Sequence, residues 1–333
     1  MKLYFHSAFR ICAIRTIVAV FSGVLLASGA QAATVRNASH LAPTGKGWAA
    51  EQSNLAFTVV TGNGINYHNG PIMPGTANVY FIWYGNWTNG QKASDRQTTV
   101  ALLNALFAPE VSSGGGLLPM GIGASGYELI NTTYGDKNFD VTGNIGLAAS
   151  TTDNYSQGNR LSDSRVQTVV SNAIKNGKLP KDANGVYFVL TSSDVSESSG
   201  FCSRYCGWHT HATISSTDIK YAFVGNPDRC PSACEMQTAS PNGDSGADGM
   251  ASIMAHEAEE TQTDPDLNAW YDSSGQENAD KCAWKFGPTT GTIGSGAYNQ
   301  TFGNGYNWLI QMNWENARGG GCDQTLGGSF YTK

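Results

Sequence analysis

The run Val79-Tyr-Phe-Ile-Trp-Tyr84 consists only of β-branched and aromatic residues. A continuous run of this kind predicts a buried strand. Two further segments have the same character, Gly185–Thr191 (GVYFVLT) and Tyr221–Gly225. These three runs are the strongest strand signals in the chain, and they predict a central sheet.

Helical patterns lie between the strands. Ser94-Asp95 can cap a helix whose apolar residues recur at helical spacing, at Val100, Leu103, Leu106 and Phe107. Residues 162–176 predict a second amphipathic helix, with one stripe formed by Val166, Val169, Val170 and Ile174. A long third helix is expected to begin near Asp248.

Strand–helix alternation followed by a cysteine-bearing region predicts an α/β or α+β fold. We expect a single domain with a mixed central sheet, flanking helices and a disulfide-stabilised C-terminal half. A weaker strand is expected near Tyr127 to Thr132. The tail from Gly287 to Lys333 is rich in Gly, Asn and aromatic residues, so it is expected to form loops and short strands.

The first 32 residues have the order of a secretory signal peptide. A basic region with Lys2, Arg10 and Arg15 precedes an apolar run from Ile17 to Leu26, and Ala30-Gln31-Ala32 resembles a cleavage site. The alternative is an uncleaved anchor, but the run is far shorter than the roughly 20 residues that span a bilayer. We therefore expect residues 1–32 to be removed, leaving a secreted chain without a transmembrane anchor.

The mature chain is expected to comprise an extended lead-in, residues 33–75, and one domain, residues 76–333. Loss of the three basic leader residues leaves 17 Lys and Arg against 26 Asp and Glu, a net charge of −9. An acidic chain without a basic cluster argues against nucleic acid and anionic membranes as partners.

Six cysteines remain in the mature chain, all in its C-terminal half: Cys202, Cys206, Cys230, Cys234, Cys282 and Cys322. An even number in an exported protein predicts three disulfides. Two C-x3-C spacings also suit a zinc site, although disulfides are favoured in an oxidising compartment. Fifteen pairings are open, and the sequence does not choose among them.

The segment that can carry chemistry is Asp248-Gly-Met-Ala-Ser-Ile-Met-Ala-His256-Glu257-Ala-Glu-Glu260. On a helix, His256 and Glu260 leave the same face one turn apart, as the two metal ligands of H-E-x-x-H zinc hydrolases do. Glu257 would then be the general base that takes a proton from the attacking water. The same residues also suit a solvated acidic helix face, but the apolar flanks favour a packed helix.

A catalytic zinc site needs a third protein ligand. We favour Glu277, in the segment Glu277-Asn-Ala-Asp280, which follows the helix after a loop. Asp266 is an alternative because it lies ten residues after His256. His209 and His211 are others, since side chains two apart in an extended segment point to the same side.

Aromatic residues offer a different kind of site. Flat rings can stack on sugar rings, although aromatic residues within strand-like runs are usually core. The candidates are Trp83, Tyr84, Trp87, Trp208, Trp270 and Tyr271.

Several short sequence segments together resemble those of the EXORDIUM-like (phosphate-induced protein) family. They include Tyr67-His-Asn-Gly-Pro71, Val79 to Trp87, Phe201 to His209, Gly225 to Cys234, Asn242 to Met250, and Asn268-Ala-Trp-Tyr271 followed by residues 277–282. The resemblance spans roughly residues 65 to 322 and identifies residues 76–333 as an EXORDIUM-like domain. It implies an extracellular or cell-wall-associated protein of a family best known from plants, without an established biochemical activity.

Two functional hypotheses follow from these observations. The first is a secreted zinc hydrolase acting on extracellular peptides, with Zn²⁺ bound by His256, Glu260 and Glu277 and with Glu257 as the base. The second is a non-catalytic extracellular protein that binds cell-wall glycan or a partner through aromatic patches.

Overall fold

A computed structural model describes residues 63–88, 95–113, 116–118 and 120–331. All of these belong to one unit, Asn37–Lys333. The predicted signal peptide, the lead-in before residue 63 and the apolar run of the leader lie outside the described residues. No helix in the described part of the chain is long and apolar enough to cross a membrane.

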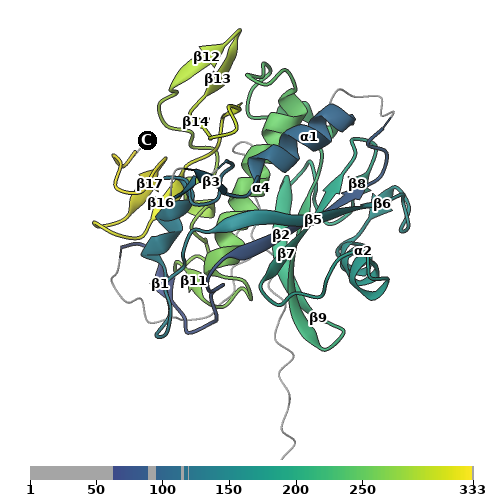
Figure 1. The fold of residues 1–333 in the computed structure, drawn as a ribbon, viewed down its shortest axis with the longest axis horizontal. Coiled ribbons are helices and arrows are strands. Elements are labelled where there is room, and N and C mark those ends of the chain that lie inside the picture. Colours follow the sequence, from purple (N-terminus) through teal and green to yellow (C-terminus); the bar gives the residue numbers. More distant parts are fainter. Residues whose placement is uncertain (1–62, 89–94, 114–115, 119, 332–333) are drawn as a thin grey trace, which may run out of the picture. The chain divides into compact units, whose positions relative to one another are not determined.

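A five-stranded mixed sheet forms the centre of this unit (Figure 1). The strand order is β5-β2-β7-β10-β9, in which only β9 runs antiparallel to its neighbour. The strands are β2 (Ala77–Tyr84), β5 (Ile145–Asp153), β7 (Gly185–Thr191), β9 (Gly207–Ile214) and β10 (Thr217–Val224). The three strongest sequence signals became the three inner strands, β2, β7 and β10, because strands covered on both faces need continuous apolar runs.

Helices cover both faces of this sheet (Figure 1). The connection from β2 to β5 and the one from β5 to β7 run in opposite directions along the sheet. Right-handed crossovers therefore place their helices on opposite faces. The longer helices are α1 (Gln97–Leu106), α2 (Asp163–Lys175) and α4 (Ser245–Thr263), and α4 packs on α1, β9 and β10.

Short elements complete the fold. The short helices are η1 (Glu128–Thr133), η2 (Pro227–Arg229), α3 (Pro231–Cys234) and η3 (Asp280–Cys282). Six two-stranded pairs surround the sheet: β1 (Asn66–Tyr67) with β11 (Trp270–Tyr271), β3 (Val111–Ser113) with β4 (Gly116–Leu118), β6 (Arg160–Leu161) with β8 (Ser196–Glu197), β12 (Gly291–Ile293) with β13 (Gly296–Tyr298), β14 (Gln300–Thr301) with β15 (Asn307–Trp308), and β16 (Asn313–Glu315) with β17 (Gly321–Asp323).

Two local predictions are wrong. The segment expected to be a strand near Tyr127 to Thr132 is the helical turn η1, in which the Thr132 and Thr133 hydroxyls donate to carbonyls three residues earlier. This local bonding competes with a sheet ladder. Asp95 does not cap α1: the N-cap residue is Arg96, and the Asp95 carboxylate accepts from the Ser193 backbone N–H at 2.7 Å.

The predicted fold class is confirmed, including the disulfides of the C-terminal half. The pairs are Cys202–Cys230, Cys206–Cys234 and Cys282–Cys322. Cys206 directly precedes β9, and Cys282 ends η3. The covalent links therefore hold two segments that, as described next, contribute side chains to the candidate site.

Candidate metal centre

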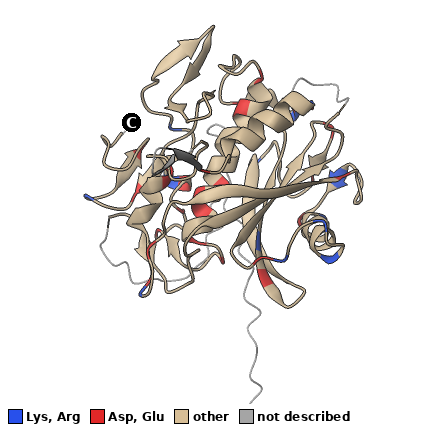
Figure 2. Cartoon of the chain, viewed as in Figure 1, with Lys and Arg blue, Asp and Glu red and all other residues tan. Residues whose placement is uncertain are grey.

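Helix α4 contains the segment His256-Glu257-Ala-Glu-Glu260 and lies in the interior of the protein. Every residue from Gly246 to Thr263 is buried, so His256, Glu257, Glu259 and Glu260 lie away from solvent. The helix begins where the Asp244 carboxylate accepts from the Ala247 N–H at 2.9 Å, a side-chain N-cap. Acidic positions on this interior helix are marked in red in Figure 2. The prediction of a packed helix is confirmed, and a solvated acidic face is excluded.

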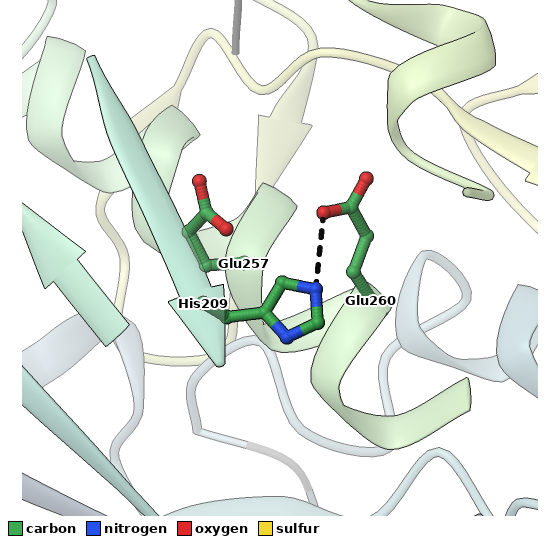
Figure 3. A group of neighbouring side chains, drawn as sticks. All are labelled: His209, Glu257 and Glu260. Atoms are coloured by element: carbon green, nitrogen blue, oxygen red, sulfur yellow. Dashed lines mark ion pairs between the residues drawn. The ribbon is translucent and has the colours of Figure 1, made fainter. Parts of the chain in front are cut away.

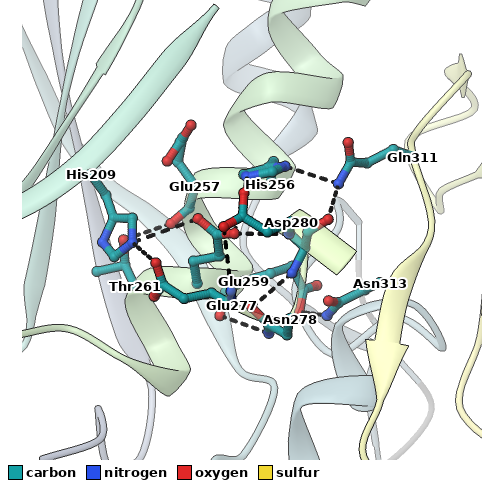
Figure 4. Close-up of polar contacts among 12 residues, drawn as sticks. His209, His256, Glu257, Glu259, Thr261, Glu277, Asn278, Asp280, Gln311 and Asn313 are labelled. Carbon is teal, nitrogen blue, oxygen red and sulfur yellow. Dashed lines mark hydrogen bonds and ion pairs between the residues drawn. The ribbon is translucent and has the colours of Figure 1, made fainter. Parts of the chain in front are cut away.

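Five buried side chains form a chain of alternating carboxylates and imidazoles, which we call the inner cluster (Figure 4). Its members, in order of contact, are Asp280, His256, Glu260, His209 and Glu277. His256 Nε2 lies 3.0 Å from Glu260 Oε1 and 3.5 Å from Asp280 Oδ1. His209 Nε2 lies 3.6 Å from Glu260 Oε2 and 3.3 Å from Glu277 Oε2. Glu260 therefore lies between the two histidines.

Three parts of the chain supply these side chains. Helix α4 provides His256 and Glu260, β9 provides His209, and the segment around η3 provides Glu277 and Asp280. Strand β9 can approach α4 closely because it has glycine at position 207. A Cβ there would lie 2.6 Å from Ile253 Cγ2 and 3.0 Å from Glu257 Oε1. The small residue thus sets how near His209, two positions further along, comes to the helix.

Glu257 projects from α4 next to His209 and Glu260, as Figure 3 shows. One ligand atom of each of these three residues lies within 4.8 Å of the others. Both carboxylate oxygens of Glu257 are buried and have no hydrogen-bond partner among the described residues. A buried carboxylate in this state is costly, because it has lost water without gaining a donor.

Amide side chains surround the inner cluster. Gln311 Nε2 lies 2.9 Å from His256 Nδ1 and 2.9 Å from the Ala279 carbonyl oxygen. The Asp280 N–H donates to Glu260 Oε1 at 3.0 Å. These contacts fix the His256 ring and the Glu260 carboxylate, which is how outer residues orient metal ligands.

The remaining predicted ligands lie in a separate group, which we call the rim cluster. His211 Nδ1 lies 2.8 Å from Asp218 Oδ1 and 3.6 Å from Asp266 Oδ1. Lys220 Nζ, on the residue that pairs with His211 across the sheet, lies 2.7 Å from Asp218 Oδ2 and 3.6 Å from Asp266 Oδ1. The alternatives His211 and Asp266 are therefore not brought to His256, whereas Glu277 contacts His209 rather than His256.

Residues 65–317, which include the whole of the inner cluster, match the family described as "Phosphate-induced protein 1 conserved region". The chain belongs to this EXORDIUM-like family. It is 32% identical to Protein EXORDIUM-like 3 of Arabidopsis thaliana over 286 residues, covering 75% of this chain and 80% of that protein. It is 27% identical to Protein PHOSPHATE-INDUCED 1 of Nicotiana tabacum over 267 residues, covering 73% and 80%. No solved structure matches.

In this EXORDIUM-like chain, burial shifts the ionisation of the inner cluster. Burial raises the pKa of Glu257 well above its usual value, and burial together with the Glu260 charge raises the pKa of Asp280 to about 7. Burial alone lowers the pKa of His256, but Glu260 and Asp280 raise it well above 6.5. Burial therefore opposes the ionisation of Glu257 and Asp280.

A divalent cation fits these residues. Two ligand atoms bound to one tetrahedral zinc lie about 3.3 Å apart, given Zn–N and Zn–O bonds of about 2.0 to 2.1 Å. The four contacts of the inner cluster, from 3.0 to 3.6 Å, bracket this separation. Imidazole with carboxylate is a ligand set suited to zinc and to other first-row divalent ions. The sequence analysis did not name Asp280 as a candidate ligand, although this residue ends the segment Glu277-Asn-Ala-Asp280.

The aromatic candidates are mostly core residues. Five of them are at most 5% exposed: Trp83, Tyr84, Trp87, Trp208 and Tyr271. Trp270 is half-buried and packs against Tyr67 and Tyr134. The five buried rings have no free face for a sugar in this structure.

Proposed function

We propose that this EXORDIUM-like protein is an exported, divalent-metal-dependent hydrolase of the peptidase type, acting on extracellular peptides. The observation that carries the proposal is the convergence of His256, Glu260 and Asp280 around one point in the interior, beside the unpartnered carboxylate of Glu257. Export is supported by the leader-like first 32 residues and by three disulfides, which form in oxidising compartments.

In this proposal His256 Nε2, Glu260 and Asp280 hold the ion. Zinc bound there would supply Lewis-acid activation of water. Glu257 accepts the proton of the attacking water and passes it to the leaving amine, so its carboxylate must be ionised. Burial raises the pKa of Glu257, and a nearby cation would act in the opposite direction.

Residues around the proposed ion hold its ligands in position. The Gln311 amide contacts His256 Nδ1, on the side of the ring opposite the proposed ion, and so orients the ring. The Asp280 N–H bond to Glu260 Oε1 keeps that carboxylate oriented toward His256. The Cys282–Cys322 disulfide holds η3, and with it Asp280, against β17.

The test is the metal content of purified mature protein by plasma mass spectrometry, together with cleavage of a library of internally quenched peptides. We expect zinc that is lost in His256→Ala. Glu257→Gln should retain the metal and lose cleavage by about 100-fold or more, the usual contribution of a general base. Cleavage that is unchanged in Glu257→Gln would overturn the proposed role of this residue, and a protein without divalent metal would overturn the proposal as a whole.

A second candidate function is favoured by one observation, the burial of the cluster. The side chains of His256, Glu260 and His209 are fully buried and that of Glu277 is 5% exposed. Closed metal sites are typical of structural ions, whereas catalytic sites keep an open position. In this alternative the ion stabilises the fold of a non-catalytic extracellular protein that binds cell-wall glycan or a partner.

The two candidates differ in what the metal does. A structural ion would leave Glu257→Gln folded and fully able to bind wall polysaccharide, with no cleavage in either protein. Chelation would then lower the melting temperature and polysaccharide binding together. In the hydrolase, chelation abolishes cleavage in wild type under conditions in which the fold persists.

A further inference from the structure

Glu260 has two oxygens, and each faces a different histidine. Oε1 lies 3.0 Å from His256 Nε2, and Oε2 lies 3.6 Å from His209 Nε2. One carboxylate thus faces two nitrogen atoms through two separate oxygens. This is the arrangement of a carboxylate that bridges two metal ions, as in two-metal hydrolases whose ions are about 3.5 to 4 Å apart.

Glu260 belongs to two groups of potential metal ligands. The first comprises His256, Glu260 and Asp280, and the second comprises His209, Glu257 and Glu260. Glu277 belongs to neither group of three, but its Oε2 lies 3.3 Å from His209 Nε2. Among the described residues, no group of three potential ligands within 4.8 Å of one another contains both histidines. A single ion would therefore bind one histidine and leave the other without metal.

Charge also favours two ions. Glu257, Glu260, Glu277 and Asp280 contribute four negative charges when they are ionised. Each histidine contacts two of these carboxylates, His256 with Glu260 and Asp280 and His209 with Glu260 and Glu277. Two divalent cations carry the charge that matches four carboxylates beside neutral imidazoles, and buried carboxylates are costly without such compensation.

The environment of Glu257 is an independent observation that favours a second cation. It is fully buried, it is directed toward His209 and Glu260 closely enough to share a ligand group with them, and neither of its oxygens has a hydrogen-bond partner among the described residues. A cation at the second group would compensate this carboxylate, which no described donor does.

We propose that the inner cluster binds two divalent transition-metal ions, one held by His256 and Asp280 and the other by His209 and Glu277, with Glu260 bridging them. This inference rests on the proposed function, to which it adds the second ion. It assigns His209 and Glu277 a defined role, and it leaves Glu257 beside the second ion in position to act on a water between the metals.

The experiment uses the full mature chain, stripped of metal and then reloaded with Zn²⁺ or Mn²⁺. Bound metal is counted by plasma mass spectrometry and by calorimetric titration, and the Mn²⁺ form is examined by electron paramagnetic resonance. We expect two ions per chain and the multiline spectrum of a spin-coupled Mn²⁺ pair. Neither measurement depends on an activity.

Three variants and a control locate the ions. His256→Ala and His209→Ala should each retain one ion and lose the coupled spectrum, and Glu260→Gln should lose the coupling and weaken both sites. His211→Ala is the matched control, since it lies on the same strand and face as His209 but belongs to the rim cluster. It should still bind two ions.

The outcomes separate this inference from the proposed function. One ion in wild type, lost in His256→Ala and kept in His209→Ala, would overturn the second ion and leave the single-metal hydrolase standing. No ion in wild type would overturn both. Because the count and spectrum of the wild-type chain are informative by themselves, a variant that fails to fold does not remove the test.

Discussion

His209 and His211 lie two residues apart on β9 and face the same side of the sheet, yet their surroundings differ. The side chain of His209 is fully buried and contacts the carboxylates of Glu260 and Glu277. The side chain of His211 is 36% exposed, and Lys220 shares both of its carboxylate partners. Two clusters of similar composition therefore differ in burial, and Lys220 supplies positive charge in the rim cluster.

The rim cluster contains its own cation. Lys220 and His211 hold the pKa of Asp218 below its usual value despite the opposing effect of burial. In and beside the inner cluster, burial and like charges raise the pKa values of Asp280 and Glu257. Burial thus opposes ionisation of the acidic residues around His256, whereas Lys220 and His211 favour ionisation of Asp218.

In a third group of buried carboxyl groups, burial is compensated in another way. Glu128 and Glu259 meet on another side of α4, and burial raises the pKa of Glu128 to about 8. Gln262 Nε2 donates to Glu128 Oε2 at 2.8 Å, and Asn313 donates to Glu259. Here protonation and amide donors replace a cation.

The largest expected effect comes from removing the covalent link beside the inner cluster. Replacing Cys282 and Cys322 together by Ala opens a disulfide between residues 40 apart in the sequence. The loss of unfolding free energy should be about 4 kcal/mol. Because Asp280 lies in the same helical turn as Cys282, metal affinity should fall as well, whereas the Lys220–Asp218 pair should persist. Chemical denaturation and metal titration measure both effects.

A result in which stability falls and metal affinity does not change would show that η3 is held by its other contacts. Replacing Cys202 and Cys230 is the matched control. That disulfide has a separation of 28 residues and does not hold η3, so its removal should cost stability with little effect on metal binding.

The second prediction compares one carboxylate from each cluster. Asp280→Asn should weaken metal binding by about 100-fold, since a protein ligand contributes about 3 kcal/mol when the 10 to 16 kcal/mol of a structural zinc site is divided among four ligands. Asp266→Asn should leave the affinity unchanged, because Asp266 lies in the rim cluster. Competition with a chromophoric chelator measures both. Equal losses in the two variants would contradict the separation of the clusters.

The third prediction concerns pH and the Glu128–Glu259 pair. The folded pKa of Glu128, about 8, lies above its unfolded value of about 4.5, so its stabilising contribution is complete below pH 4.5 and is lost as the pH rises through 8. Glu128→Gln, which can still accept from Gln262, should flatten this decline. The expected change in slope is at most about 1.4 kcal/mol per pH unit.

Urea denaturation of both proteins between pH 5 and pH 9 measures that slope. Parallel stability curves for the variant and the wild type would contradict the assignment. Glu110→Gln, at a position outside these clusters, is a control for the general effect of removing one acidic residue.

The smallest expected effect is at the rim. Lys220→Met removes the cation between Asp218 and Asp266, and partly exposed ion pairs contribute about 0.2 to 1 kcal/mol. A carboxylate whose folded pKa is lowered stabilises the protein above its unfolded pKa. The loss should therefore appear at pH 7 and disappear as the pH falls below about 4. Thermal denaturation at both pH values measures it; an equal loss at pH 3 would indicate packing rather than charge.

The sequence alone predicted several of the main strands and helices. The strands β2 and β7, the helix α2 and the helix α4 were predictable because each depends on local pattern: continuous apolar runs, or apolar residues at helical spacing. Strand β5 was missed because its sequence, IGLAASTTD, is polar and lies at an edge of the sheet. The turn η1 was misassigned because Thr and Tyr favour strands only where a neighbouring strand is available.

The sequence also determined the pair His256 and Glu260, since a helix places residues four apart on one face whatever surrounds it. Which other groups join that pair is a matter of tertiary structure. Sheet order brings His209 to α4, and a disulfide-held turn brings Asp280, 24 positions beyond His256 in the sequence. Contacts between residues so distant along the chain depend on packing, because no local periodicity encodes them. Only the fold, therefore, separated the candidate ligands of the inner cluster from His211 and Asp266.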